Sequence, residues 1–323
     1  MKNTVDQTLE LVLNADRRAI ARAISNVENE AADSTAILQA LYRHTGRAYR
    51  IGVTGPPGAG KSTLTNKLAG HYRGLGFRVG VIAVDPTSPF TGGALLGDRV
   101  RMTDVEMDDG VFIRSMASRG SLGGLSKRAN EAADILDAAG FDRVLMETVG
   151  VGQSELDIAG AADTTVVVLV PESGDGIQAM KAGLMEIADF FVMNKSDRPG
   201  ADQAVMSIKM ILGFKSKGDT EWAPEVVKTV ANQAVGVDEV ATIVERHKAF
   251  LESTDGLERK RTARLRNRVR ELVDGKLQVT FWNEERTREL ELGLASLLNR
   301  ATTPYDLAAT LARTKAGVEK NVD

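Results

Sequence analysis

A glycine-rich segment between a predicted strand and a predicted helix constrains this chain more than any other feature. Residues 55–62 read Gly-Pro-Pro-Gly-Ala-Gly-Lys-Ser, directly after the apolar run 51–54, and residues 62–73 have a helical pattern. Glycines let backbone N–H groups turn towards a phosphate, and the following helix presents its positive end to that phosphate. The sequence therefore predicts a phosphate-binding loop, in which Lys61 reaches the β- and γ-phosphates and the Ser62 hydroxyl binds Mg²⁺. The predicted nucleotide contacts here are Gly55, Pro56, Pro57, Gly58, Ala59, Gly60, Lys61, Ser62 and Thr63.

Apolar runs alternate with helical patterns between residues 48 and 250. This alternation predicts an α/β fold, a P-loop NTPase whose mostly parallel sheet is covered by helices on both faces. Ligands of such sheets bind at the carboxyl ends of the strands. The predicted strands are 50–54, 79–84, 111–115, 143–147, 164–170, 190–194 and 226–231, and the helices between them include 62–73, 126–138, 177–188 and 201–211.

Helical patterns without strands flank this central part. Residues 1–47 are expected to form an N-terminal helical extension, in which Asp16 is a candidate helix cap. Residues 251–323 are expected to form a C-terminal helical arm, with the stretch 278–282 ambiguous between helix and strand. Its Arg-rich segment is interpreted as a solvated face or a subunit contact rather than an RNA site, since the net charge argues against nucleic acid. The central domain is then 48–250.

The composition excludes several classes of protein. The formal net charge is −3, which argues against a general attraction to nucleic acid or to an anionic membrane. The chain has no cysteine, which excludes disulfides and thiolate metal sites and suits a reducing cytosol. Residues 1–7 lack the apolar core of a signal peptide, and the run 166–170 is too short to span a membrane. We therefore expect a cytoplasmic protein that binds neither nucleic acid nor membranes.

A second motif predicts which base is bound. Asn194-Lys195-Ser-Asp197 directly follows the predicted strand 190–193. The Asp197 carboxylate can accept hydrogen bonds from guanine N1–H and the exocyclic amine, whereas adenine lacks that pair of donors. The sequence therefore predicts GTP and GDP as ligands. Further support for the base is expected from backbone N–H groups at Val230, Ala231 and Asn232.

Carboxylates are predicted to gather around the magnesium ion that the phosphates need. Glu147 ends the predicted strand 143–147, and Asp85 follows the predicted strand 79–84. Mg²⁺ prefers oxygen ligands, so we expect Ser62, Asp85, Asp98 and Glu147 around it, some through water. The N–H of Gly150 is predicted to contact the γ-phosphate. Lys61, Asp98 and Glu147 are the predicted catalytic residues.

The segment after Gly150 predicts slow hydrolysis. Val151 stands where some GTPases carry a water-orienting glutamine, and Gln153 lies two residues further on. Phosphoryl transfer depends on positioning and charge stabilisation, so we expect weak turnover alone and faster turnover with a partner. The candidate charge stabilisers in the chain itself are Arg99, Arg101 and Arg114.

Three segments together resemble one family, the methylmalonyl-CoA mutase-associated GTPases of the MeaB/ArgK group. Residues 85–102 resemble its switch I, residues 147–155 resemble its switch II, and residues 112–124 fit as well. The resemblance implies a SIMIBI-type P-loop domain with an N-terminal helical extension and a C-terminal dimerisation arm. It also implies Mg²⁺-site carboxylates at Asp85, Asp98 and Glu147.

The function implied by this resemblance is that of a G-protein chaperone. Members gate adenosylcobalamin loading of an acyl-CoA mutase and protect that mutase, so the implied partners are such a mutase and a second copy of this chain. The implied partner switch lies in 171–181, with Asp175, Gln178 and Lys181 as its residues. The client mutase is not fixed by the sequence.

Three alternatives remain open. The first is a GTP- or ATP-dependent kinase or ATPase of an amino-acid (LAO/AO) transport system, which phosphoprotein formation would distinguish. The second is a nucleotide-dependent scaffold in which hydrolysis is incidental. The third, a nickel-delivery GTPase, is disfavoured because such proteins need Cys or His at the metal and this chain has no Cys and three scattered His.

Overall fold

Two compact units make up the chain, residues 1–261 and 262–323. The computed structural model describes residues 2–85, 105, 108–117, 127–148, 154–171, 182–213 and 222–313. The boundary between the units falls inside one helix, α11 (Gly256–Phe281).

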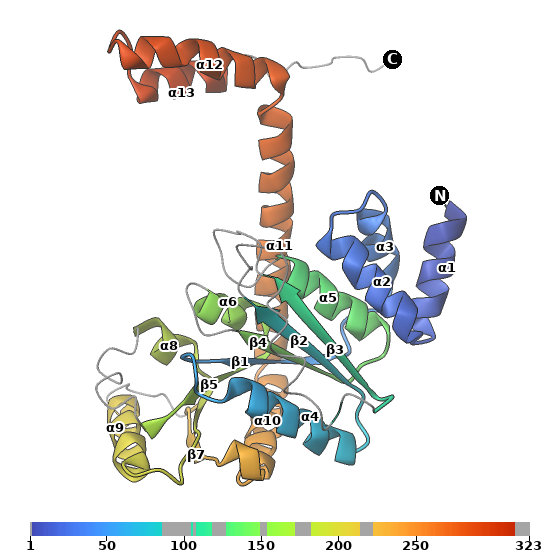
Figure 1. Ribbon diagram of the computed structural model, residues 1–323, viewed down its shortest axis with the longest axis vertical. Helices are drawn as coiled ribbons and strands as arrows, with labels where there is room; N and C mark the ends of the chain where they lie inside the picture. Colours follow the sequence, from blue (N-terminus) through green and yellow to red (C-terminus); the bar gives the residue numbers. More distant parts are fainter. Residues whose placement is uncertain are drawn as a thin grey trace. The chain divides into compact units, whose positions relative to one another are not determined.

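The first unit is built on a seven-stranded sheet in which every pairing of neighbouring strands is parallel (Figure 1). The order is β3-β2-β4-β1-β5-β6-β7, which places β1 in the centre. The predicted α/β fold is therefore confirmed. Strands β1, β4 and β5 are buried along their whole length, which explains their continuous apolar runs. The strands are β1 (Tyr49–Thr54), β2 (Val79–Asp85), β3 (Val111–Ala117), β4 (Arg143–Thr148), β5 (Thr164–Leu169), β6 (Phe190–Met193) and β7 (Val226–Lys228).

Helices cover both faces of this sheet (Figure 1). One face packs against α4 (Lys61–Gly74) and α10 (Val237–Ser253). The helices that pack against the other face are α5 (Lys127–Ala138), α6 (Ser154–Ala161), α8 (Ala182–Ile187) and α9 (Ala201–Gly213). Among the described residues, none of the helices is both long and apolar enough to cross a lipid bilayer.

The N-terminal helices extend the layer that contains α5. They are α1 (Lys2–Leu13), α2 (Arg17–Glu28) and α3 (Ser34–Leu41), followed by a 3₁₀ turn, η1 (Tyr42–His44). Asp16 caps α2 as predicted, since its Oδ1 accepts a hydrogen bond from the Ala19 N–H at 2.7 Å. The apolar stripe of α2 joins the core that includes α5, so these helices share one hydrophobic core with the sheet.

One predicted strand ends earlier than expected, and one ambiguous stretch is helical. Strand β7 ends at Lys228, where the prediction continued to 231, because residues 231–233 turn into a 3₁₀ helix, η4 (Ala231–Gln233). The ambiguous stretch 278–282 is helical as far as Phe281, as part of α11. The second unit continues with α12 (Glu284–Leu298) and α13 (Pro304–Arg313), which approach closely where the position of a Gly293 Cβ lies 2.6 Å from Leu307 Cδ1.

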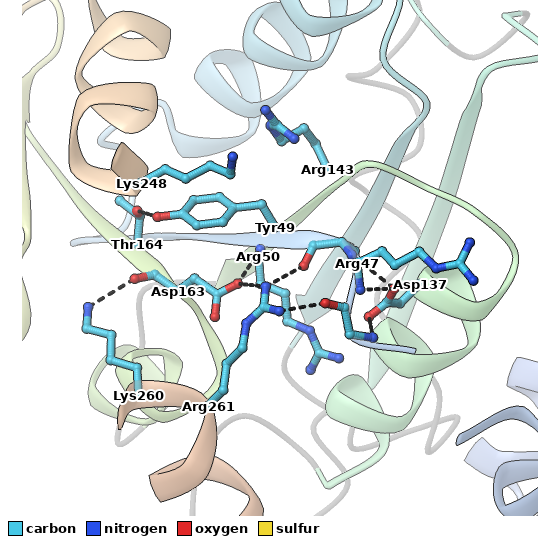
Figure 2. A network of polar contacts seen from close by, with 12 residues as sticks. Arg47, Tyr49, Arg50, Asp137, Arg143, Asp163, Thr164, Lys248, Lys260 and Arg261 are labelled. Atoms are coloured by element: carbon cyan, nitrogen blue, oxygen red, sulfur yellow. Dashed lines mark hydrogen bonds and ion pairs between the residues drawn. The ribbon is translucent and has the colours of Figure 1, made fainter. Parts of the chain in front are cut away.

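Two basic residues at the start of α11 hold the amino ends of three strands together. Figure 2 shows their contacts with Asp163, directly before β5. We call Lys260 and Arg261 the basic clamp. Lys260 Nζ donates to the Asp163 carbonyl and to both carboxylate oxygens of Asp189, each at 3.0 Å. Arg261 donates to Asp163 Oδ2 at 3.2 Å and to the carbonyl of Ala48 at 2.9 Å. Because these residues directly precede β1, β5 and β6, the clamp fixes the edge of the sheet opposite the phosphate loop.

Residues 46–48, which link η1 to β1, are also held by α5. Asp137 of α5 accepts hydrogen bonds from the backbone N–H groups of Gly46, Arg47 and Ala48, at 2.7, 3.1 and 3.0 Å. Arg261 binds the carbonyls of Gly46 and Ala48 (Figure 2). A carboxylate therefore binds the three N–H groups of this linker and a guanidinium binds two of its carbonyls, which fixes the start of the central strand.

A buried histidine next to the clamp predicts how stability depends on pH. His247 is 1% exposed, its Nδ1 lies 2.7 Å from Thr164 Oγ1, and burial lowers its pKa to about 4. Unfolding raises that pKa towards about 6.5, so the unfolded state binds more protons between these values and stability falls as the pH drops. Between pH 7 and pH 5 we expect His247 to reduce the free energy of unfolding by about 2 kcal/mol. Denaturant unfolding at both pH values measures this.

The matched comparison is His247→Gln, which removes the titrating group. Its own stability is expected to be lower at pH 7, because the buried contact to Thr164 is altered. Its additional loss on going to pH 5 should be about 2 kcal/mol smaller than that of the unchanged chain. An identical pH dependence in both chains would contradict a depressed pKa at His247.

Candidate nucleotide site

The phosphate loop joins the central strand to α4 with backbone conformations that favour glycine. Gly55 and Gly60 have φ values of 134° and 88°. A Cβ on Gly55 would lie 2.1 Å from the Val168 carbonyl oxygen of β5, and one on Gly60 would lie 2.3 Å from Asn194 Nδ2. The loop is thus packed against β5 on one side and against the Asn194 motif on the other, and both positions need the absence of a side chain.

Lys61 and Ser62 begin α4, and each makes a specific polar contact. Lys61 is 5% exposed, and its Nζ donates to the carbonyls of Gly55 and Pro56, both at 2.9 Å. Ser62 Oγ donates to Glu147 Oε1 at 2.5 Å. The buried ammonium group of Lys61 therefore lies over the first residues of the loop. The Ser62 hydroxyl and the Glu147 carboxylate form a pair next to it.

The Ser62–Glu147 pair fits a magnesium ion. Both oxygens lie at the carboxyl edge of the sheet, since Glu147 belongs to β4 and Ser62 follows β1. A hydroxyl and a carboxylate are the hard oxygen ligands that Mg²⁺ prefers. In the part of the chain that the structure describes, no group of three or more His, Cys, Asp or Glu gathers as a metal site. The predicted ligand Asp85 ends β2, but its side chain is outside the described residues, as is Asp98.

The predicted guanine motif lies directly against the phosphate loop. Asn194 Nδ2 donates to the Ala59 carbonyl at 2.8 Å, and Lys195 Nζ donates to the Gly58 carbonyl at 2.8 Å. Two segments that are more than 130 residues apart in the chain are thereby joined into one site. Both contacts use side chains of the motif to hold the loop, and Asn194 is buried with 3% exposure.

Asn194 is itself held by the turn after β7. Its Oδ1 accepts hydrogen bonds from Thr229 Oγ1 and from the Ala231 N–H, both at 3.1 Å. The Ala231 N–H, which the sequence predicted as support for the base, therefore contacts Asn194 in this structure. The sequence analysis did not predict Thr229 as a site residue. Its position directly after the last strand could have indicated that it lies at the ligand-binding edge of the sheet.

The remaining predicted residues differ in their exposure, and several lie outside the described residues. Asp197 and Asn232 are exposed, whereas Val230 is buried and bridges to Val235. Pro56 is half-buried, and Pro57 and Gly58 are exposed on the loop. The predictions at Gly150, Asp175, Gln178 and Lys181 fall outside the described residues, as do Arg99 and Arg101.

Arg114, the third arginine that was a candidate for stabilising charge during hydrolysis, binds residues of α2 instead. Its Nη2 donates to Glu28 Oε2 at 2.5 Å and to Ser25 Oγ at 3.0 Å, so it ties β3 to α2. The Arg114 guanidinium thereby joins the N-terminal helices to the sheet.

A comparison with known protein families shows which family of nucleotide-binding proteins this chain resembles over most of its length. The model described as "Methylmalonyl Co-A mutase-associated GTPase MeaB" matches residues 20–286. The chain belongs to this family of GTPases. The resemblance noted in the sequence is thereby confirmed, and the family match covers the phosphate loop, the Asn194 motif and the whole of α11.

Individual relatives agree over nearly the whole length. A Pyrococcus horikoshii protein named "Putative GTPase" is 47% identical over 306 residues, covering 94% of this chain and 96% of that protein. The GTPase ArgK of Escherichia coli is 36% identical over 312 residues, covering 93% of both. A solved structure described as an LAO/AO transport system kinase is 28% identical with a TM-score of 0.73, and 97% of each chain is covered.

Proposed function

We propose that this chain is a GTP-binding and GTP-hydrolysing chaperone of an adenosylcobalamin-dependent acyl-CoA mutase. In this proposal it gates the loading of adenosylcobalamin and protects the mutase. It acts as a homodimer with Mg²⁺ in the reducing cytosol, which suits a chain without cysteine. Hydrolysis is slow in the free protein and faster with the mutase.

The contact of Asn194 and Lys195 with the phosphate loop carries the guanine-nucleotide part of this proposal. It brings the base-reading motif and the phosphate-binding loop to one edge of the sheet, where parallel α/β sheets bind their ligands. Asp197 is exposed, and in this proposal its carboxylate accepts hydrogen bonds from the guanine edge. Lys61, Ser62 and Glu147 would hold the phosphates and Mg²⁺, and Mg²⁺ would supply charge neutralisation.

The mutase partner is supported by the family, whose model is named for its association with methylmalonyl-CoA mutase. The predicted switch residues Asp175, Gln178 and Lys181 remain part of this proposal as the contact with the mutase. Asp85, Asp98 and Gly150 likewise remain proposed ligands of the metal and the γ-phosphate.

The homodimer is supported by an exposed apolar stripe on α11. Leu265, Val269, Leu272, Val273 and Leu277 recur at helical spacing and are between 38% and 61% exposed. A stripe of this kind on one helix fits burial against an equivalent helix. The arm 251–323 is therefore proposed as the dimerisation element.

The proposed function is tested by measuring GTP turnover with and without purified methylmalonyl-CoA mutase. The free protein should turn over below about 1 s⁻¹, and the mutase should raise this rate at least about tenfold, because assisted GTPases gain their charge stabilisation from a partner. The Lys61→Ala variant serves as the control for residual turnover. No stimulation by this mutase or by isobutyryl-, ethylmalonyl- and hydroxyisobutyryl-CoA mutases would contradict the proposal.

A second candidate is a kinase of an LAO/AO transport system, which the description of one similar structure favours. A kinase would transfer the terminal phosphate to a protein, whereas the proposed GTPase releases it to water. Radiolabelled GTP and ATP distinguish the two, through a labelled protein band or free phosphate.

A further inference from the structure

A buried hydroxyl at the end of the central strand joins three elements of the nucleotide site. Thr54, the last residue of β1, is 0% exposed. Its Oγ1 accepts a hydrogen bond from Thr148 Oγ1 at 2.9 Å and donates one to the Glu155 carbonyl at 3.3 Å. Thr148 is the last residue of β4 and is also 0% exposed, while Glu155 lies in the first turn of α6.

Thr54 and Thr148 are each the direct neighbour in the chain of a residue of the nucleotide site. Thr54 directly precedes Gly55, the first residue of the phosphate loop, and Thr148 directly follows Glu147, which binds Ser62 Oγ. In the parallel pairing of β1 and β4, Val53 lies opposite Glu147. The hydroxyl pair therefore links the two strands one residue beyond that register pair, at the point where the phosphate loop begins.

A hydroxyl is the only part of the threonine side chain that can make both contacts. It has one donor and two acceptor positions, which matches one accepted and one donated hydrogen bond. Valine has nearly the same shape but would leave the Thr148 hydroxyl and the Glu155 carbonyl without these bonds in a buried place. The expected consequence is a looser connection between the end of β4 and the phosphate loop, with the packing volume kept.

We propose that Thr54 is a positioning residue for GTP hydrolysis. It fixes the end of β4, and with it Glu147, against the phosphate loop, and it fixes the first turn of α6 to the same point. It touches no reacting atom itself. This inference rests on the proposed function, since it needs the loop to bind GTP and Glu147 to serve the metal.

The experiment compares Thr54→Val with Thr54→Ser and with Thr65→Val. Thr65 is a matched control because it is a 0% exposed threonine of α4 whose hydroxyl has no hydrogen-bond partner among the described residues. Thr54→Val should lower GTP turnover about tenfold while GDP affinity stays within about twofold, since one buried hydrogen-bond chain is lost and the base contacts remain. Thr54→Ser should restore turnover, and Thr65→Val should match the unchanged chain.

A second variant keeps the test decisive if Thr54→Val does not fold. Thr148→Val breaks the same pair from β4 and should lower turnover similarly, and the double variant should be no slower than Thr54→Val. Unchanged turnover in Thr54→Val or Thr148→Val would overturn the inference, as would an equal loss in Thr65→Val. Absence of guanine-nucleotide binding by the unchanged chain would instead overturn the proposed function, and this inference with it.

Discussion

Alanine in place of Gly60 is expected to weaken guanine-nucleotide binding at least about a hundredfold. The new Cβ would lie 2.3 Å from Asn194 Nδ2. Asn194 is buried and holds Ala59 of the loop as well as Ala231, so it can retreat only by losing these hydrogen bonds. Two buried hydrogen bonds together are worth about 2–3 kcal/mol, which corresponds to the expected loss of affinity. Fluorescence titration with a labelled GDP measures it.

Gly58 offers the matched control in the same loop. It also has a positive φ, 73°, but a Cβ there would meet nothing within 4 Å. Gly58→Ala should therefore add only the strain of a left-handed backbone, about 1–2 kcal/mol, and weaken binding roughly tenfold. Equal losses at Gly58 and Gly60 would contradict the role assigned to Asn194, because they would show backbone strain alone to be responsible.

Removing the guanidinium of the basic clamp is expected to cause the largest loss of stability. Arg261→Ala removes an ion pair of the Asp163 carboxylate, which is 0% exposed, and it also removes the donors to the carbonyls of Gly46 and Ala48. Breaking a buried ion pair from one side costs about 3–5 kcal/mol. We expect the unfolding free energy to fall by about 3 kcal/mol and the melting temperature by roughly 6–12 °C.

Arg259→Ala is the control for this change, because Arg259 lies on the same helix two residues earlier and is exposed. A surface substitution of this kind should change the unfolding free energy by no more than about 0.5 kcal/mol. Calorimetry of both variants gives the comparison. Melting temperatures of Arg261→Ala and Arg259→Ala that agree within error would show that the clamp does not stabilise the sheet edge.

The features that could be predicted from the sequence are those that consecutive residues define. The phosphate loop occupies eight consecutive residues, 55–62, and the Asn194 motif directly follows a strand. The strands could be found because helices cover both faces of the sheet, so the strands are rich in apolar residues. Strand β7 was extended too far because Val230 and Ala231 are buried in a turn rather than in the sheet.

The contacts that escaped prediction join residues far apart in the chain. Thr54 and Thr148 are 94 residues apart, and Asp163 and Arg261 are 98 residues apart. No local pattern marks a threonine at a strand end or a basic residue on a helix as one half of such a pair. Thr54 and Thr148 meet because β1 lies beside β4 in the sheet, an order that the alternation of strands and helices leaves open.

The most direct measurement is calorimetric titration of the full chain with GDP and with ADP in the presence of Mg²⁺. A site that reads guanine through Asp197 should bind GDP at least about a hundredfold more tightly than ADP, since adenine lacks the paired donors. In the same titration Asp197→Asn should favour xanthosine diphosphate, whose C2 carbonyl can accept from the new amide. Equal affinities for GDP and ADP, with no effect of Asp197→Asn, would contradict a guanine-nucleotide site in this protein.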